Sequence, residues 1–327
     1  MSLAAIARRR ASARAEAAGI AVPPASQGAG LVAGGLVEAL DLAIGRRAAG
    51  VLPGERRAAG LGTGTELAQL RPYQVGDDVR RLDAAASART GVPHVRDHVP
   101  ERTLTTWILL DVSASMAFGT AQRLKSDVAG GVATVVGRLA ARRGGRVALL
   151  TCGAPVQRML PPRGGRRGLV ALQRVVDEGV AADGHTPGDG ALGAGMRRIG
   201  RLARGPGLVV VISDFRAGGV GGVVISAPPP WTRELRALAA RHDVLAVEVI
   251  DPRESELPDA GPLVLADPET GMRVRADSSG KELRRRFAAA ELARRDALRA
   301  ELRRARARHV EVCTDGDWLR ALGRGLR

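Results

Sequence analysis

A short apolar run, Trp107 to Leu110, ends abruptly at Asp111, and this boundary constrains the fold more than any other feature of the sequence. An unbroken apolar run of this length is typical of a strand that is buried on both faces, as in a parallel sheet. The polar residues that follow then lie at the carboxyl end of the strand, where open α/β sheets bind their ligands. We therefore expect an α/β protein with a site directly after this strand.

The chain from residue 103 onward alternates between strand and helix patterns. Apolar residues at helical spacing predict helices, which cover 124–142, 166–177, 189–202, 234–241, 282–308 and 317–322. Short apolar runs predict strands, at 146–151, 154–160, 207–212, 244–250 and 309–314, and a small hairpin at 263–266 and 272–275. Alternation of this kind favours right-handed crossovers, so we expect a largely parallel sheet flanked by helices.

The loop after the first strand reads D-V-S-A-S, with Asp111, Ser113 and Ser115 at alternate positions. One carboxylate and two hydroxyls on a tight loop are hard oxygen donors, which suit a small divalent cation such as Mg²⁺ or Mn²⁺. The same residue types also cap the start of helices by accepting hydrogen bonds from backbone N–H groups. The loop by itself leaves both interpretations open.

Composition limits the class of partner. Hydrophobic residues make up 45% of the 327 residues and aromatic residues only 2%, so a sizeable core must be built from aliphatic side chains. The net charge of +16 is compatible with an anionic partner such as nucleic acid, and equally with a lineage that prefers arginine to lysine. The scarcity of aromatic side chains, on which bases would stack, favours the second interpretation.

Cysteine content and hydropathy indicate the compartment. Cys152 and Cys313 are the only cysteines, and neither belongs to a zinc-binding or disulfide pattern, so a reducing compartment is expected. No apolar run approaches the length needed to cross a bilayer, and the N-terminal residues lack the apolar core of a signal peptide. We therefore expect a cytoplasmic protein without a membrane span.

Residues 54–102 form a second informative segment, between an Ala/Arg-rich tail with a weak helical pattern (1–53) and the α/β region (103–327). Opposite charges alternate within it, which indicates either a fixed network of arginine–carboxylate pairs or an ordinary solvated surface. Its glycines at 60, 62 and 64 lack the spacing of a phosphate-binding loop, so a flexible loop is the simpler interpretation. Residues 92–96 have the pattern of a strand that enters the main domain.

Two more oxygen-bearing side chains complete a constellation with the D-V-S-A-S loop. Asp214 follows the apolar strand at 207–212, and Thr186 lies in a loop between two helices. This arrangement resembles the metal-ion-dependent adhesion site of von Willebrand factor A domains, which implies a Rossmann-like von Willebrand factor A-type sheet. The resemblance implies that the two serines and Thr186 bind one cation, directly or through water, and that an open position receives a carboxylate from a partner. A cation held by few protein charges stays Lewis-acidic and attracts such an anion.

The stretch from Glu55 to Phe215 resembles the bacterial domain-of-unknown-function 58 family, which places an acidic–arginine block ahead of a von Willebrand A-like domain. The resemblance depends on the run G-x-G-x-E-L-A-x-L-R-x-Y-x-x-G-D-D-V-R-R-L-D, a later S-A-R, and D-V-S-A-S-M-A-F-G. Ala84 departs from the family, which usually has tryptophan at that position. The motif residues are Glu66, Arg71, Tyr73, Gly76, Asp77, Asp78, Arg80, Asp83 and Arg89.

The family resemblance implies a non-enzymatic partner of MoxR-type AAA+ ATPases, acting in the maturation of other proteins or in metal insertion. A serine hydrolase is a rival function, but neither Ser113 nor Ser115 lies in a G-x-S-x-G motif, and His185 is an isolated loop histidine. Binding of nucleic acid or another anionic partner through the basic helix at 282–308 is a second rival. The alternative interpretation, which the sequence favours, is that this segment is a docked amphipathic helix with a solvated basic face.

Overall fold

The computed structural model describes Gly30 and residues 66–99, 104–120, 122–142, 144–182, 190–216 and 228–326. These residues belong to two compact units, a small one within residues 52–103 and a larger one that includes residues 104–327. Each unit contains its own sheet. Among the described residues, no helix combines the length and the apolar character that a membrane crossing requires.

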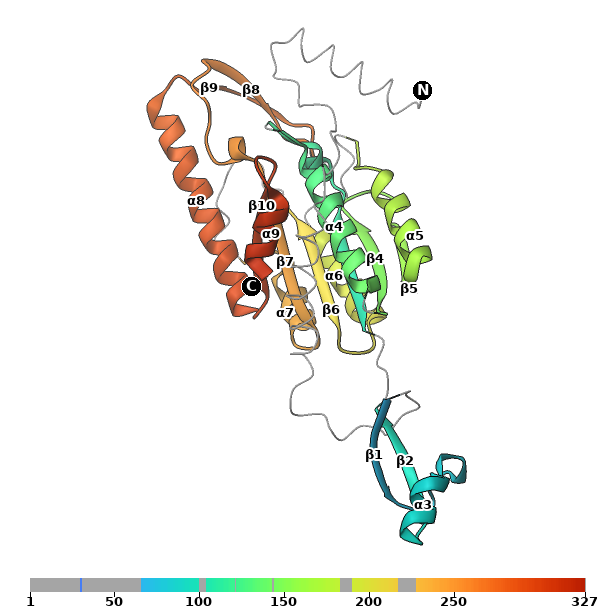
Figure 1. Cartoon of the computed structure of the whole chain (residues 1–327). Helices are drawn as coiled ribbons and strands as arrows, with labels where there is room; N and C mark the ends of the chain where they lie inside the picture. Colours follow the sequence, from blue (N-terminus) through green and yellow to red (C-terminus); the bar gives the residue numbers. More distant parts are fainter. Residues whose placement is uncertain are drawn as a thin grey trace. The chain divides into compact units, whose positions relative to one another are not determined.

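The larger unit is built on a six-stranded sheet with the order β10-β7-β6-β3-β4-β5 (Figure 1). Its strands are β3 (Thr105–Asp111), β4 (Arg146–Cys152), β5 (Met159–Gly164), β6 (Leu208–Ser213), β7 (Asp243–Ile250) and β10 (Arg308–Cys313). All neighbours are parallel except the edge strand β5, which runs antiparallel to β4. This is the strand order of Rossmann-like folds, with a switch point between β3 and β6. The predicted largely parallel, Rossmann-like sheet is confirmed.

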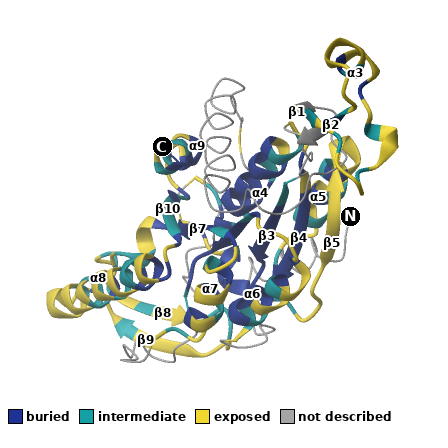
Figure 2. Cartoon of the chain, turned by 90° about the horizontal axis from the view of Figure 1, so that it is seen from below, coloured by how far each residue is buried: buried dark blue, intermediate teal, exposed yellow. Residues whose placement is uncertain are grey.

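Helices cover both faces of this sheet (Figures 1 and 2). One face carries α4 (Lys125–Arg142), α5 (Gly165–Asp177) and α9 (Trp318–Leu326), and the other carries α6 (Ala191–Leu202), α7 (Thr232–Ala239) and α8 (Lys281–Arg304). Within β3, Ile108 and Leu110 pack toward the first face, whereas Trp107 and Leu109 pack toward the second. Because successive side chains of a strand point to opposite faces, burial of both faces explains the unbroken apolar run.

Two elements differ from the prediction in ways that have local causes. The strand expected at 154–160 is β5, which begins at Met159 and contains Pro161 and Pro162. Proline is tolerated there because β5 is an edge strand, so one side of its backbone needs no partner in the sheet. The helix expected to reach residue 308 is α8, which ends at Arg304, because the chain turns at Arg306 with a φ of 57° before β10 begins.

The segment between β7 and α8 leaves the sheet and returns to its carboxyl-terminal end. A short helix, η4 (Pro252–Glu254), follows β7, and the predicted hairpin is present as β8 (Pro262–Ala266) paired antiparallel with β9 (Arg273–Asp277). Figure 1 shows this hairpin at the same end of the sheet as the loop that follows β3. Most residues of both hairpin strands are exposed.

The small unit consists of a two-stranded antiparallel sheet, a 3₁₀ helix and one α-helix. Its elements are β1 (Glu66–Pro72), η1 (Val79–Arg81), α3 (Ala84–Thr90) and β2 (His94–Val99). The strand predicted at 92–96 exists as β2, but the expectation that it enters the main domain is wrong, because β2 pairs with β1.

Candidate functional site

The described polar residues of the predicted site lie at the switch point of the sheet. β3 ends at Asp111 and the neighbouring β6 ends at Ser213, with Asp214 directly after it. From this pair of strands the chain proceeds in opposite directions across the sheet, and open α/β folds bind their ligands at such a point. Asp111, Ser113, Ser115 and Asp214 are all buried.

The carboxylate of Asp111 is held by hydrogen bonds from uncharged donors. Its Oδ1 accepts the backbone N–H of Ser113 at 2.9 Å, and its Oδ2 accepts the hydroxyl of Ser213 at 2.6 Å. Burial, and then the charge of nearby Asp214, raise the pKa of Asp111. Among the described residues, no basic side chain forms an ion pair with Asp111. This buried carboxylate therefore lacks a positive partner of its own.

Ser113 and Ser115 place two hydroxyls beside that carboxylate. Their Oγ atoms lie 3.1 Å apart, and the loop that carries them begins the short helix η2 (Ala114–Ala117). Ser113 occupies the N-cap position of η2, but its side chain makes no capping hydrogen bond. The alternative in which the serines cap a helix therefore does not account for Ser113, and α4 begins only at Lys125.

Gly153, in the turn after β4, keeps the floor of the site open. Its φ of 83° is in the left-handed region, which favours glycine. A Cβ atom at this position would lie 2.7 Å from both Asp111 Oδ1 and Ser113 Cβ. A side chain here would therefore fill the space beside the candidate ligands.

Asp214 differs from Asp111 because it already has a positive partner. The buried ammonium of Lys125, at the start of α4, donates to Asp214 Oδ2 at 2.7 Å and to Glu254 Oε1 at 2.6 Å. Burial alone would raise the pKa of Asp214, but the charge of Lys125 holds it below its usual value. Burial alone would lower the pKa of Lys125, but the two carboxylates raise it. The sequence analysis missed Lys125, whose only signal is a lysine at the start of the helix that follows the D-V-S-A-S loop.

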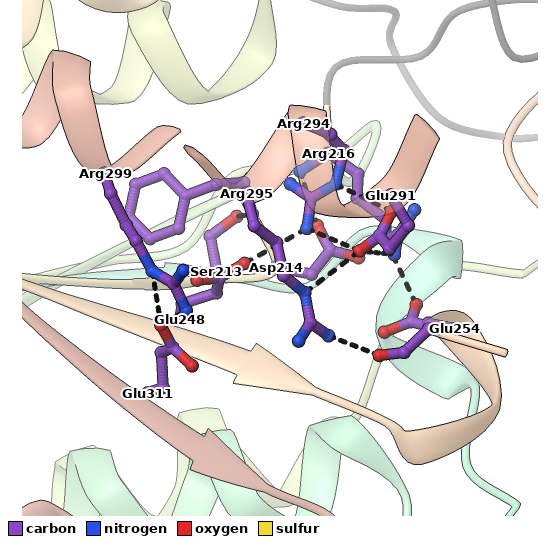
Figure 3. Close-up of polar contacts among 12 residues, drawn as sticks. Ser213, Asp214, Arg216, Glu248, Glu254, Glu291, Arg294, Arg295, Arg299 and Glu311 are labelled. Atoms are coloured by element: carbon purple, nitrogen blue, oxygen red, sulfur yellow. Dashed lines mark hydrogen bonds and ion pairs between the residues drawn. The ribbon is translucent and has the colours of Figure 1, made fainter. Parts of the chain in front are cut away.

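The charged groups around Asp214 continue toward α8 (Figure 3). Arg216 lies two residues after Asp214, and its Nε forms an ion pair with Glu254 at 3.2 Å. The other end of the same guanidinium pairs with Glu291 of α8 at 2.9 Å. Lys125 and Arg216 thus share Glu254, which joins the candidate site to α8 through ion pairs.

Two arginines of α8 also form ion pairs with carboxylates. Arg294 pairs with Glu291 at 3.0 Å and with the buried Glu248 of β7 at 3.1 Å, and Arg299 pairs with Glu311 of β10 at 2.7 Å. Figure 3 shows these side chains pointing from the helix onto the sheet. Arg294 and Arg299 therefore dock the helix on the sheet, as expected for a docked amphipathic helix, whereas Arg286 and Arg303 of the same helix are exposed.

A second group of possible metal ligands, Glu248, His309 and Glu311, lies within this docking region. Their ligand atoms are within 4.8 Å of one another. Burial alone would raise the pKa of Glu248, but the hydrogen bond from His309 and the charge of Arg294 lower it. Because each carboxylate already pairs with an arginine, this group has the features of an ion-pair network and not of a vacant cation site.

One residue that the sequence analysis did not single out approaches the site from the β8–β9 hairpin. Burial, and then the charges of Asp214 and Asp111, raise the pKa of Glu269 to about 7, whereas an interaction with the Ser115 side chain lowers it. Glu269 lies in the turn of the hairpin and is half-buried. A third carboxylate therefore faces the same pair of strand ends.

The structure does not test every predicted ligand. Thr186 and the rival base His185 lie within 183–189, outside the described residues, so the role of Thr186 stays a prediction. Of the remaining ligands, the structure brings together two hydroxyls, the Asp111 carboxylate, which has no positive partner among the described residues, and the Asp214 carboxylate, which pairs with Lys125. Those donors fit Mg²⁺ or Mn²⁺ by chemistry, since both ions prefer oxygen ligands.

The motif residues of the small unit form separate local contacts. Arg71 makes a two-pronged pair with Asp77, with both N–O distances 2.7 Å, and the hydrogen bond from Arg71 is the main cause that lowers the pKa of Asp77 to about 2. Asp83 caps α3 through the N–H of Ala86 at 2.8 Å and accepts from Arg96 at 2.6 Å.

The other motif residues are more exposed than a buried network requires. Asp78 accepts the backbone N–H of Arg80, and both side chains are exposed, as is Arg89. Tyr73 is partly buried, and the side chain of Glu66 lies outside the described residues. Of the two interpretations of the alternating charges, an ordinary solvated surface describes Arg80 and Arg89 better than a fixed network does. Ala84, which stands where the family usually has tryptophan, is the exposed first residue of α3.

Comparison with known proteins gives a family and a set of relatives. The family model described as "Protein of unknown function DUF58" matches residues 69–297. An uncharacterized protein of Mycobacterium tuberculosis (strain ATCC 25618 / H37Rv) is 39% identical over 280 residues, covering 86% of this chain and 84% of that protein. An uncharacterized protein of Mycobacterium avium is 38% identical over 160 residues, covering 49% of this chain and 87% of that protein.

Among solved structures, the chain is similar to BatB from Bacteroides thetaiotaomicron, with 14% identity and a TM-score of 0.41 over 68% of this chain and 97% of that one. It is also similar to the SpRpn10 VWA domain, with 13% identity and a TM-score of 0.34 over 66% of this chain and 92% of that one. Such low scores support no comparison of function. The family model, in contrast, covers more than half of the sequence and includes residues 69–102 of the acidic–arginine segment together with the candidate site. The chain therefore belongs to the family of proteins of unknown function DUF58.

Proposed function

We propose that the larger unit is a non-enzymatic protein-binding module that uses Mg²⁺ or Mn²⁺ to capture an acidic side chain of a partner. The observation that carries this proposal is the buried carboxylate of Asp111, which has two hydroxyls beside it and no positive partner among the described residues. Burying such a charge is costly unless a cation or a proton compensates it.

The arrangement of the other groups supports a binding role for this loop. Ser113 and Ser115 offer neutral oxygens, and Asp214 is already neutralised by Lys125, so few negative charges remain for a cation at this place. Such a cation supplies a Lewis-acidic position that favours an incoming carboxylate. We further propose that Thr186 adds an oxygen ligand from its loop.

Catalysis is a weaker explanation of the same residues. Nucleophilic serine chemistry needs a base within hydrogen-bond reach of the hydroxyl. Among the described residues, the histidine with buried, unpartnered nitrogens is His242, between α7 and β7, and His309 is bonded to Glu248. Neither serine hydroxyl is hydrogen-bonded to a described imidazole.

The partner that we propose is a MoxR-type AAA+ ATPase or its client, in the cytoplasm, an assignment that depends on the family resemblance. The test is binding of the purified ATPase to immobilised protein, with Mg²⁺ and after chelation. We expect chelation to release the complex, and Ser113→Ala to weaken it without lowering the melting temperature of the apo protein.

A control variant in α8 separates this proposal from binding of nucleic acid or another anion through that helix. Arg286 and Arg303 are exposed residues of that helix. Their replacement by serine should change binding little at physiological salt, where exposed charges more than about 8 Å apart are largely screened from one another. Binding that ignores the chelator but collapses in the Arg286→Ser/Arg303→Ser variant would contradict the proposed function and favour the anionic partner.

A further inference from the structure

The turn of the β8–β9 hairpin has a defined conformation that fixes where its side chains lie. The Asp267 carboxylate accepts the backbone N–H of Glu269 at 2.9 Å and the hydroxyl of Thr270 at 2.7 Å. The N–H of Gly271 donates to the Asp267 carbonyl at 2.8 Å, and Gly271 takes the left-handed φ of 72° that the turn requires. Glu269 is therefore held at the end of a structured turn.

That turn brings the Glu269 carboxylate to the candidate site. The β8–β9 hairpin lies at the same end of the sheet as the loop that follows β3 (Figure 1), and the Glu269 carboxylate interacts with the Ser115 side chain and with the charges of Asp111 and Asp214. Among the described residues, Asp214 is the one of these three carboxylates that forms an ion pair with a basic side chain, Lys125. Carboxylates that share a site repel one another unless a proton or a cation lies between them. The cluster is therefore incomplete as an electrostatic arrangement without an added positive charge.

We propose that Glu269 is an internal ligand, whose carboxylate takes the open position of the cation at Asp111, Ser113 and Ser115 until the carboxylate of a partner displaces it. This inference deepens the proposed function and depends on it. A carboxylate near Ser115, on a separate element, is in place to complete a shell of oxygen donors.

The β8–β9 hairpin can move away from the site without breaking contacts in the core around the six-stranded sheet. Most of its strand residues are exposed, and its base is held by the backbone bond from Ser278 to Gly261 at 2.8 Å and by Arg284, which donates to the Ser278 carbonyl. Displacement of Glu269 therefore costs no buried apolar contact within the sheet. If the hairpin fills the site about nine-tenths of the time, its removal strengthens binding of an external carboxylate about tenfold.

The test uses the full chain with Mn²⁺ alone as the first probe. Water-proton relaxation reports how many exchangeable waters remain on the bound Mn²⁺, and a titration gives the affinity. In Glu269→Gln we expect Mn²⁺ to bind about tenfold more weakly or worse, with a higher relaxation enhancement because water replaces the carboxylate. Glu256→Gln, which removes one exposed acid before the hairpin, is the matched control and should behave as the wild type.

Two further measurements examine the hairpin and the displaced position. Hydrogen exchange of residues 262–277 should slow on addition of Mg²⁺ in the wild type and not in Glu269→Gln. Acetate at millimolar concentration should lower the Mn²⁺ relaxation enhancement in Glu269→Gln and have little effect in the wild type. Glu269→Ala should repeat both results, which guards against a glutamine that still binds the cation.

The outcomes separate this inference from the function on which it depends. Equal Mn²⁺ affinity, relaxation and hydrogen exchange in the wild type and both Glu269 variants would overturn the internal ligand and leave the metal-dependent module standing. Absence of Mn²⁺ binding in the wild type would overturn both proposals together.

Discussion

At the scale of single residues, Asp111 and Asp214 show how two neighbouring buried aspartates acquire different roles. Both are buried aspartates at the ends of adjacent strands. Lys125 neutralises Asp214, whereas the described partners of Asp111 are the uncharged hydrogen-bond donors of Ser113 and Ser213. We interpret Asp214 as a structural carboxylate and Asp111 as the anchor of the candidate cation site.

The role of Lys125 leads to a stability prediction. Lys125→Met removes a fully buried ammonium and leaves Asp214 with no ammonium partner, which should lower the free energy of unfolding at pH 7 by about 3–5 kcal/mol. Urea denaturation measures the change, and Lys125→Met/Asp214→Asn should recover part of it. Arg158→Ala, which breaks an exposed pair with Glu178, is the control and should cost under about 0.5 kcal/mol. A loss in Lys125→Met no larger than in the control would contradict the buried-pair interpretation.

The residue scale also shows what the sequence could and could not predict. The D-V-S-A-S loop was predictable because its donors are adjacent in the chain and follow an apolar strand. Lys125 and Glu269 were not, because they reach the site through α4 and through a hairpin far along the chain. Their roles depend on tertiary packing, which leaves no periodic signal in the sequence.

At the scale of secondary-structure elements, the acidic–arginine segment acts through local caps and pairs. Asp83 is at once the N-cap of α3 and the partner of Arg96. Arg80, by contrast, is exposed, as expected for the solvated surface that was the second interpretation of the alternating charges. Alternation of charge reports sequence spacing alone, so it cannot show which charged side chains turn inward.

This difference gives an ordering of two variants. Asp83→Ala should speed hydrogen exchange of the α3 amides markedly, because it removes the cap and the link to β2 together. Arg80→Ala should leave that exchange within error of the wild type. Mass spectrometry of peptides that cover residues 84–90 measures both. Faster exchange in Arg80→Ala than in Asp83→Ala would contradict the contacts described.

The docking of α8 depends on carboxylates whose pKa values are depressed. Burial alone would raise the pKa of Glu291, but the hydrogen bond from Arg294 and the charge of Arg216 hold it below its usual 4.5. A group with a lowered folded pKa contributes stability above its unfolded pKa and loses it as the pH falls. The contribution of Glu291 should therefore be complete at pH 7 and disappear below about pH 4.5.

Urea denaturation between pH 7 and pH 3 tests the docking of α8. Glu291→Gln should be less stable than the wild type at pH 7, and the gap should close as the pH falls below 4.5. Glu282→Gln, which removes an exposed acid from the same helix, should follow the wild type throughout. A gap that widens in acid would show that Glu291 does not act through its charge.

At the scale of the whole molecule, the sheet order determines where the site lies. The alternation of strands and helices predicted a largely parallel sheet, and the reversal between β3 and β6 places the D-V-S-A-S loop beside Asp214. The exact edges were less predictable, because β5 contains two prolines and α8 ends at a turn that no residue pattern marks.

The central claim is that Asp111 anchors a divalent cation, and calorimetric titration of Mn²⁺ tests it most directly. We expect one site in the wild type, no binding in Asp111→Asn, and unchanged binding in His309→Ala, which removes a member of the alternative group at Glu248. Saturating Mg²⁺ should stabilise the wild type by about 2.7 kcal/mol at 100 times its Kd. Absence of binding in the wild type, or equal binding in Asp111→Asn, would contradict the account.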